Sequence, residues 1–387
     1  MVEVFYGGGG GLPGVGDQLL RQGAAGMAGT AEAGDRFGAA LASGLVDSGD
    51  EADLAVGAPG ENVGATADAG AVSLVDGAAG GLLGSPNLLV NESQAETGDG
   101  FGAAVEIGDL SGGGGTAGPD DLAVGAPGEN VGATADAGAV SLIEAAEDGS
   151  GLPAGAVQER FFQGNSGVPG ASEAGDRFGA ALASGVFGSG GIDLAVGVPG
   201  EDVGSAADAG AVVVLVGPTL HALLTQGGPA TAGGLLPGAT ESGDQFGAAL
   251  ATGDFDGDNA DNLVIGVPGE NLGTVADAGA VISLCGNEGL MAGCPDGVLT
   301  QANPETGDAY GAALTEGNFD GNEFPDLAVG APGETVAGAV AAGAADARDG
   351  EFGGLPAGPD APLYFQSSDG VPGSAEAGDL FAAALAA

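Results

Sequence analysis

The sequence predicts an all-β protein, a β-propeller of four-stranded antiparallel blades, and three observations support this prediction. A Gly-Asp-x-Phe-Gly landmark recurs along the 387 residues, each repeat contains four short apolar runs, and no long window shows helical periodicity. Glycine and proline number 84 and 20. An aperiodic chain of that composition is usually disordered, so order in this chain depends on the repeat.

The landmark divides the chain into equivalent repeats. It occurs at residues 34–38, 98–102, 175–179 and 243–247, in a Tyr version at 307–311 and in a decayed copy at 378–382. Each of the first five copies is followed by an Asp-Leu-Ala-Val run and a Gly-Ala-Pro-Gly-Glu segment, or close variants, which begin at residues 53, 121, 193, 262 and 326. Blades are therefore expected to start near residues 34, 98, 175, 243, 307 and 378.

Each repeat is expected to form four strands. In the first repeat these are residues 37–42, 53–56, 71–75 and 87–90, which are rich in Val, Leu and Ala and are separated by Gly, Pro, Asn and Asp. That punctuation is typical of strands and turns. In the fifth repeat the third strand is expected at residues 338–341. Four strands in each repeat of about 65–70 residues favour a propeller blade over a sandwich.

The two ends of the chain supply complementary strand types. Residues 1–22 provide a third-type strand at 2–6 and a fourth-type strand at 18–22, whereas residues 381–385 provide a first-type strand. We therefore expect a single propeller over residues 1–387, with six blades and with both termini in one blade. A truncated seven-bladed propeller is the alternative. The terminal blade lacks its second strand, and we favour truncation over a strand donated by another copy.

The net charge excludes several classes of function. The chain has 54 acidic and five basic residues, a formal net charge of −49. Such a surface repels nucleic-acid phosphates and anionic membranes, so nucleic-acid binding is not expected. The sequence has no run of 18 apolar residues and no basic segment before residues 2–6, so neither membrane insertion nor a signal peptide is expected.

One loop has the residue pattern of a cation site. Asp254, Asp256 and Asp258 alternate in the loop that joins the first and second strands of the fourth repeat. Oxygens at alternate positions of a tight loop point inward, which suits a hard cation such as Ca²⁺. An acidic turn without metal is the alternative, because Asp and Asn side chains also bond to nearby backbone groups in turns.

A catalytic role for the recurring acidic residues is disfavoured. The glutamates of Pro-Gly-Glu and the aspartates of Asp-Ala-Gly recur in the same register from repeat to repeat, whereas a catalytic pair should break the repeat. We expect them to cap turns by accepting backbone N–H groups. The only histidine, His221, has no Ser or Cys nucleophile motif near it.

The only two cysteines, Cys285 and Cys294, flank a short glycine-rich segment. This spacing favours a hairpin disulfide, with two unpaired thiols as the alternative. A zinc site is not expected, because the chain has one distant histidine and no further cysteine.

The paired landmarks resemble a known repeat. Phe37 and Gly38 are followed about twenty residues later by Gly-Ala-Pro at 57–59, and the pairing recurs in later copies with Tyr for Phe at 310 and Val for Ala at 198 and 267. This resembles the FG-GAP repeat of integrin α-subunit propellers and their bacterial relatives, over essentially the whole chain. The sixth copy departs, with Ala382 for Gly and no Gly-Ala-Pro. The resemblance implies an extracellular or cell-surface location and adhesion or ligand binding.

The resemblance also implies two calcium-ligand sets. In the family, side-chain oxygens at loop positions 1, 3, 5 and 9 and the backbone carbonyl at position 7 bind Ca²⁺. The matching residues are Asp254, Asp256, Asp258, Ala260 (carbonyl) and Asn262 in the fourth repeat, and Asn318, Asp320, Asn322, Phe324 (carbonyl) and Asp326 in the fifth.

The two loops differ at position 6 and in charge. Asn259 replaces the usual glycine and tolerates a left-handed conformation, whereas Glu323 does not favour one. The fifth-repeat loop has only two carboxylates, so we expect weaker calcium affinity there. The corresponding loops of the first three repeats have lost ligands, most completely in the third.

These observations predict an extracellular, calcium-stabilised and non-enzymatic module for binding, adhesion or surface assembly. Its partners would be a protein or glycan ligand at the cell surface, or other copies of itself. The alternatives are a structural subunit of a surface filament and a propeller enzyme, a hydrolase or lyase. An enzyme would show a cluster of polar residues that breaks the repeat in one blade, and outside the cation loops the sequence suggests none.

Overall fold

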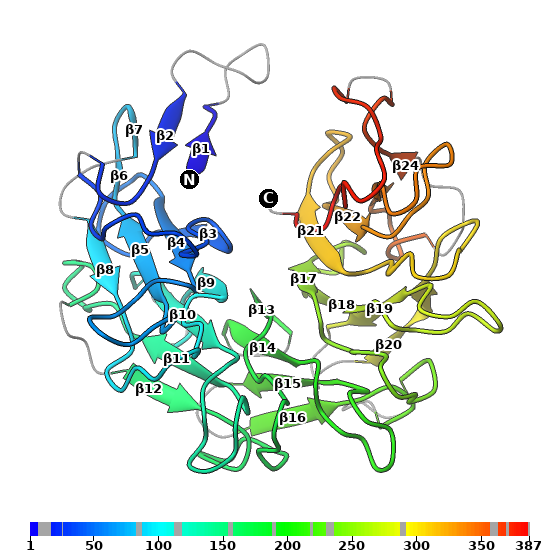
Figure 1. Ribbon diagram of the computed structural model, residues 1–387, viewed down its shortest axis with the longest axis horizontal. Helices are drawn as coiled ribbons and strands as arrows, with labels where there is room; N and C mark the ends of the chain where they lie inside the picture. The colour runs from blue at the N-terminus through cyan, green and yellow to red at the C-terminus, as the bar shows by residue number, and fades with distance from the viewer. Residues whose placement is uncertain are drawn as a thin grey trace. The chain divides into compact units, whose positions relative to one another are not determined.

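A computed structural model describes residues 1–6, 17–24, 26–82, 87–111, 118–153, 158–187, 191–216, 220–229, 236–286, 292–356, 363–368 and 371–385. The chain separates into two compact units: unit 1 contains residues 1–166 and 171–182, and unit 2 contains residues 167–170 and 183–387. The regular elements of the described residues are β-strands (Figure 1). In this part of the chain, no helix is long and apolar enough to cross a membrane.

Unit 1 contains two four-stranded antiparallel sheets. The first has the strand order β3-β4-β5-β8, with bounds Leu41–Gly44, Asp53–Ala58, Ala71–Val75 and Leu88–Val90. The second has the order β12-β11-β10-β9, with bounds Gln158–Phe161, Ala139–Ile143, Asp121–Ala126 and Ala104–Gly108. Two short pairs complete the unit: β1 and β2 at Val2–Val4 and Gln18–Leu20, and β6 and β7 at Gly77–Ala78 and Gly81–Leu82.

The remaining sheets belong to unit 2, whose boundary falls at the beginning of β13. The third sheet runs β13-β14-β15-β16, at Leu182–Gly185, Asp193–Val198, Ala211–Val216 and Leu220–Leu224. The fourth runs β17-β18-β19-β20, at Leu250–Gly253, Asn262–Val267, Ala280–Cys285 and Ala292–Leu299. The fifth runs β21-β22-β23-β24, at Ala313–Gly317, Asp326–Ala331, Ala344–Arg348 and Leu363–Tyr364. These sheets confirm the predicted all-β class with four-stranded antiparallel blades of the propeller type.

The second strand of each sheet forms the core because its sequence is almost continuously apolar. In β4 and β10 nearly every residue is buried, as expected for a strand covered on both faces. The strand begins at an aspartate that binds the backbone of the flanking loops. In β4, Asp53 accepts hydrogen bonds from the backbone N–H groups of Val46, at 3.1 Å, and Gly77, at 2.8 Å. Its carboxylate thereby satisfies two backbone donors of the flanking loops.

A glycine and an aromatic residue connect each sheet to the following repeat. Gly70, the last residue of Asp-Ala-Gly, adopts φ +88° and forms a parallel bridge with Phe101 of the next landmark. The same bridges join Gly138 to Phe178, Gly210 to Phe246 and Gly279 to Tyr310. All four aromatic rings are fully buried. The landmark therefore places an aromatic ring in the core against the backbone of the preceding repeat.

The landmark itself is a turn, so the prediction of a strand at residues 37–42 was wrong at its beginning. The N–H of Ala39 donates to the carbonyl of Arg36 at 2.9 Å, and Arg36 and Gly38 adopt φ values of +54° and +90°. Left-handed residues interrupt an extended strand, and β3 begins only at Leu41. Residues 381–384 form the same kind of turn and not the expected strand.

The third strand of the fifth repeat also lies elsewhere than predicted. Residues 338–341 form a turn, and β23 begins six residues later than expected, at Ala344. Gly343, with φ +82°, determines this register, because it approaches the backbone of Phe381 as Gly70 approaches that of Phe101. The weakly apolar run at 338–341 was a false signal.

The terminal segments lie against the sheets of their own units. Val2 of β1 and Leu20 of β2 pack with Val56 and Val75 of the first sheet. In unit 2, the N–H of Phe381 donates to the carbonyl of Ala342 at 2.9 Å, as a landmark aromatic does at the other repeat boundaries. The described residues form five four-stranded sheets, and the sixth blade stays a prediction.

Candidate metal sites

The loop between β17 and β18 folds around the side chain of Asp254. Its Oδ1 accepts hydrogen bonds from the N–H groups of Gly257, at 2.8 Å, and Asp258, at 3.0 Å, and its Oδ2 accepts from that of Asn259, at 3.0 Å. Gly257 and Asn259 adopt φ values of +76° and +69°. The left-handed conformation expected for Asn259 is therefore present, and it lets the loop turn tightly.

This turn brings three carboxylates together. One oxygen from each of Asp254, Asp256 and Asp258 lies within 4.8 Å of the others. Burial raises the pKa of Asp256, and the neighbouring charges of Asp258 and Asp254 raise it further. Because the donor atoms are hard oxygens on a compact loop, they fit Ca²⁺, which when bound would remove the repulsion between the carboxylates.

Asn262 and Ala260 lie beside this group. Asn262 is buried at the start of β18, where its Oδ1 accepts from the N–H of Phe255 at 2.9 Å and its Nδ2 lies 3.5 Å from Oδ2 of Asp256. The N–H of Ala260 donates to Oδ1 of Asp258 at 2.8 Å. In this conformation the amide oxygen of Asn262 serves the backbone, so its role as a calcium ligand stays a prediction.

The loop between β21 and β22 has a comparable set of turns. Oδ1 of Asn318 accepts from the N–H of Gly321, Oδ1 of Asp320 from that of Asn322, and Oδ1 of Asn322 from that of Phe324, at 2.6, 2.8 and 2.6 Å. The loop turns at Gly321, with φ +80°, and Glu323 keeps a negative φ. The unfavourable residue at position 6 is therefore accommodated without a left-handed conformation.

A third carboxylate joins this fifth-repeat group, and the sequence prediction missed it. One oxygen each of Asp320, Asp326 and Asp349 lies within 4.8 Å of the others. Asp326 is buried and accepts from the N–H groups of Phe319, at 2.6 Å, and Gly350, at 2.9 Å. Asp349 directly follows β23, and because the third strand was expected earlier in the sequence, its position beside the loop was not recognised.

The position of Asp349 has counterparts in other repeats. Asp76 directly follows β5, where burial raises its pKa and the charges of Asp53 and Asp47 raise it further. In the fourth repeat the corresponding residue is Cys285, whose Sγ lies 3.6 Å from Oδ2 of Asp256. An acidic residue directly after the third strand is thus a sequence signal that could have identified Asp349.

The predicted disulfide falls partly outside the described side chains. Cys285 is disulfide-bonded. Cys294, the only other cysteine of the chain, lies in β20 among residues whose side chains are not described. The pairing of Cys285 with Cys294 remains the prediction made from their spacing.

Three of the five recurring glutamates accept hydrogen bonds from side chains, so for them the prediction that they cap turns through backbone N–H groups was wrong. Oε2 of Glu61 accepts from Nε2 of Gln22 at 2.6 Å, and Glu270 and Glu334 accept in the same way from Gln226 and Gln301. The aspartates of Asp-Ala-Gly instead adopt φ values near +50°. Turn capping belongs to the landmark aspartates, whose Oδ2 atoms accept the N–H of the residue three positions earlier.

Comparisons with known proteins identify the repeat. Residues 246–284, which contain the β17–β18 loop and its three aspartates, match the model of the FG-GAP repeat. The chain is also 30% identical over 166 residues to Integrin alpha-PS5 of Drosophila melanogaster. That match covers 41% of this chain and 15% of the integrin subunit, so the chain spans a small part of that relative. The chain therefore carries an FG-GAP repeat and is distantly similar to an integrin alpha subunit.

Proposed function

We propose that this chain is an extracellular, non-enzymatic binding module that is stabilised by calcium at the loops of its fourth and fifth repeats. The observation that carries the proposal is the grouping of Asp254, Asp256 and Asp258 inside the segment that matches the FG-GAP repeat. The distant similarity to an integrin subunit supports adhesion or ligand binding as the activity. A protein or glycan at a cell surface, or another copy of the chain, is the proposed partner.

Calcium should raise the melting temperature of the protein, and a chelator should lower it. Three close carboxylates repel one another, and a cation that binds only the folded state adds RT ln(1 + [L]/Kd), about 2.7 kcal/mol at a hundredfold excess over Kd. The measurement is thermal unfolding with and without chelator at one fixed high ionic strength. The magnitude of the shift reports the calcium affinity of the two loops together.

Two variants assign this calcium response. Asp256→Ala should remove most of the contribution of the fourth repeat, whereas Asp193→Asn, which changes an acid of the ligand-poor third repeat, should leave the response unchanged. If calcium gives no more stabilisation than monovalent salt of equal ionic strength, the loops are acidic turns and the calcium proposal fails.

We also propose the single six-bladed propeller over residues 1–387, in which β1 and β2 share a blade with residues 381–385. The packing of Val2 and Leu20 on the first sheet and the bond from Phe381 to Ala342 support it, because each resembles a contact between consecutive repeats. Spin labels at Glu3 and Ala383 should report one short distance that does not change with protein concentration. A short distance that appears only at high concentration would favour strand exchange between copies.

A further inference from the structure

A polar pair recurs just beyond the fourth strand of the repeats. In three repeats a glutamine amide donates to the glutamate of Pro-Gly-Glu, with Nε2 to Oε2 distances of 2.6, 2.6 and 2.9 Å for the pairs Gln22–Glu61, Gln226–Glu270 and Gln301–Glu334. Two of the other three copies also have glutamine at this position, Gln163 and Gln366. The remaining copy has Glu92. Glu92 therefore replaces a hydrogen-bond donor by a carboxyl group.

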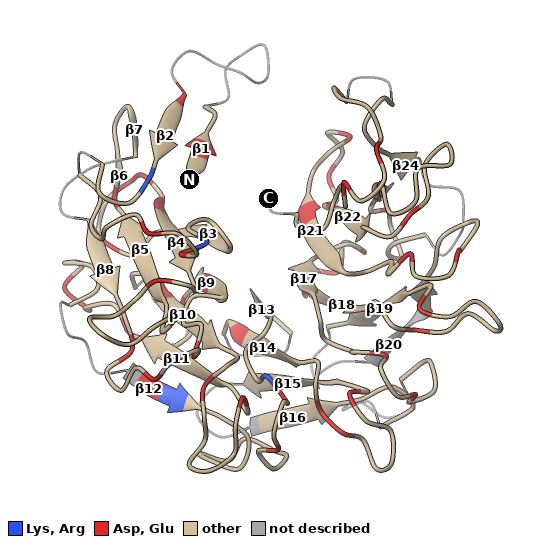
Figure 2. Ribbon diagram, in the orientation of Figure 1, with Lys and Arg blue, Asp and Glu red and all other residues tan. Residues whose placement is uncertain are grey.

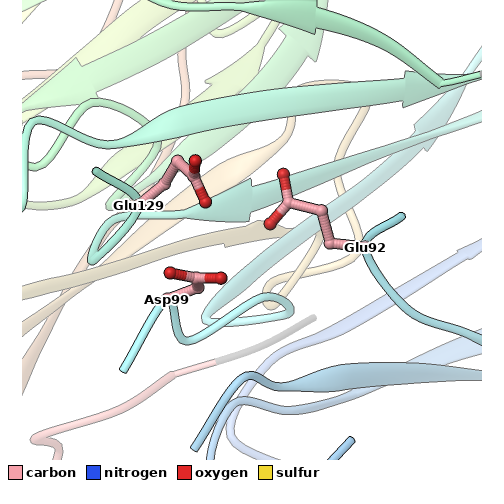
Figure 3. A group of neighbouring side chains, drawn as sticks. All are labelled: Glu92, Asp99 and Glu129. Carbon is pink, nitrogen blue, oxygen red and sulfur yellow. The ribbon is translucent and has the colours of Figure 1, made fainter. Parts of the chain in front are cut away.

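The substitution places three carboxyl groups together in unit 1. Glu92, Asp99 and Glu129 have exposed fractions of 2%, 0% and 4%, and one oxygen of each lies within 4.8 Å of the others. Figure 3 shows the three side chains converging on one point, Glu92 from the segment after β8, Asp99 from the landmark before β9 and Glu129 from the segment after β10.

One basic residue partly neutralises the group. Arg160 of β12 places NH2 2.6 Å from Oε1 of Glu129 and NH1 3.3 Å from Oε1 of Glu92. It is one of only five basic residues, whereas acidic residues are spread over the connecting loops of both units (Figure 2). Three ionised carboxylates beside one guanidinium would leave two uncompensated buried negative charges, which is strongly unfavourable.

The unused oxygens show where positive charge is missing. Oδ2 of Asp99 accepts from the N–H of Glu96 and Oε1 of Glu129 contacts Arg160. The remaining four oxygens, both of Glu92, Oδ1 of Asp99 and Oε2 of Glu129, are buried and have no hydrogen-bond partner, although Oε1 of Glu92 lies 3.3 Å from NH1 of Arg160. A proton on Glu92 would convert one of these acceptors into a donor.

We infer that Glu92 is a protonated carboxylic acid at neutral pH and donates a hydrogen bond to Glu129, so that the boundary of the first two repeats carries a pH-sensitive bond. A protonated glutamate has the size and shape of glutamine and presents its donor at the same end of the side chain. It thus reproduces the bond made by Gln22, Gln226 and Gln301 in the other repeats. Arg160 then neutralises Glu129, and the net charge of the group changes from −2 to −1.

The electrostatics of the surroundings agree with this assignment. Burial raises the pKa of Glu92 to about 8, with a further contribution from the charge of Glu129, an opposing one from Arg160 and a smaller one from Asp99. Burial also raises the pKa of Asp99 to about 6, and Glu129 and the exposed Glu96 add to that shift. These are the titratable and charged groups that face Glu92 from the segments after β8 and β10, before β9 and on β12.

The bond makes the stability of unit 1 depend on pH in a defined direction. The native state retains the proton of Glu92 at pH values at which the unfolded chain, with an ordinary pKa of 4.5, has lost it. The stabilisation is therefore complete below about pH 4.5, declines as the pH rises and is lost once the pH passes about 8. Acidification strengthens this boundary, and alkaline conditions weaken it.

The test compares the wild type with Glu92→Gln, which restores the residue found in the other repeats. The difference in melting temperature between variant and wild type, measured from pH 5 to pH 9, should grow in favour of the variant as the pH rises. Glu147→Gln removes an exposed charge of unit 1 that does not belong to this group and should leave the pH dependence of the wild type unchanged. Gln226→Glu introduces an acid pair that lacks an arginine, and it should lose melting temperature progressively over the same range.

A spectroscopic measurement identifies the proton directly. The infrared difference spectrum of wild type minus Glu92→Gln at pH 6 should contain the carbonyl stretch of a protonated carboxylic acid, and this band should disappear above about pH 9. A parallel pH dependence of the two proteins, or the absence of that band, would overturn the inference. A stability difference that appears only when a divalent cation is added would also overturn it, because a metal would then occupy the place of the proton.

Discussion

Asp346→Ala is expected to destabilise unit 2 by about 3–5 kcal/mol, the cost of leaving a buried charge without its partner. Asp346 and Arg348 lie on β23 with side chains only 3% and 2% exposed, and NH2 of Arg348 is 2.6 Å from Oδ2 of Asp346. The hydroxyl of Tyr310 donates to the same oxygen at 2.8 Å. Removing the carboxylate would strand a guanidinium in the core, which urea unfolding of the variant would measure.

The fourth repeat provides the matched control for this prediction. It has Phe246, Ile282 and Leu284 at the positions of Tyr310, Asp346 and Arg348, as the strand registers show. The triple variant Tyr310→Phe, Asp346→Ile, Arg348→Leu replaces the whole polar group by apolar residues. Replacing a buried ion pair in this way is often neutral or stabilising, so the triple variant should recover most or all of the stability. An Asp346→Ala variant within about 1 kcal/mol of wild type would mean that the pair is not desolvated in solution.

Gly70→Ala is expected to destabilise unit 1 by about 3 kcal/mol or more, because overpacking adds to a strained backbone conformation. A Cβ atom at Gly70 would lie 2.2 Å from the backbone oxygen and 2.4 Å from the backbone nitrogen of Phe101. No rotation of a side chain can relieve a clash with backbone atoms. The fully buried ring of Phe101 would have to move with its backbone, and chemical denaturation would report the loss.

Gly64→Ala separates the steric effect from the conformational one. Gly64 adopts φ +65°, but no heavy atom lies within 4 Å of the position that its Cβ would occupy. The variant should therefore lose only the cost of a left-handed alanine, about 1–2 kcal/mol. If both variants lost the same free energy of unfolding, the close contact between Gly70 and Phe101 would add nothing to the cost of the left-handed backbone conformation.

The strands could be predicted from sequence where apolar runs are long and bounded by turn residues. Residues 71–75 coincide with β5, and the Asp-Leu-Ala-Val run correctly gives the start of β4 at Asp53. The prediction failed at the landmark, because alanines next to Phe37 and Gly38 look like a strand while left-handed conformations at Arg36 and Gly38 form a turn. Composition does not reveal the sign of φ for a non-glycine residue such as Arg36.

The candidate sites were predictable where their residues are close in sequence and not where the fold brings them together. Alternate spacing was enough to group Asp254, Asp256 and Asp258. Asp349 joins Asp320 only because β23 ends beside their loop, and Glu92 meets Glu129 only across a repeat boundary. The departure of position 92 from glutamine was visible in the sequence, but its meaning required the contact of Gln22 with Glu61.

The glycine–aromatic contact has a consequence for how this chain could change in length over evolution. Each Asp-Ala-Gly glycine touches the landmark aromatic of the next repeat. These junctions are therefore all built from the same two surfaces, the glycine of one repeat and the aromatic residue of the next. Insertion or loss of one whole repeat, cut at any equivalent position, would recreate the same contact at the new junction. Gene duplication could therefore create a new repeat whose glycine–aromatic contact needs no compensating mutation at the new junction.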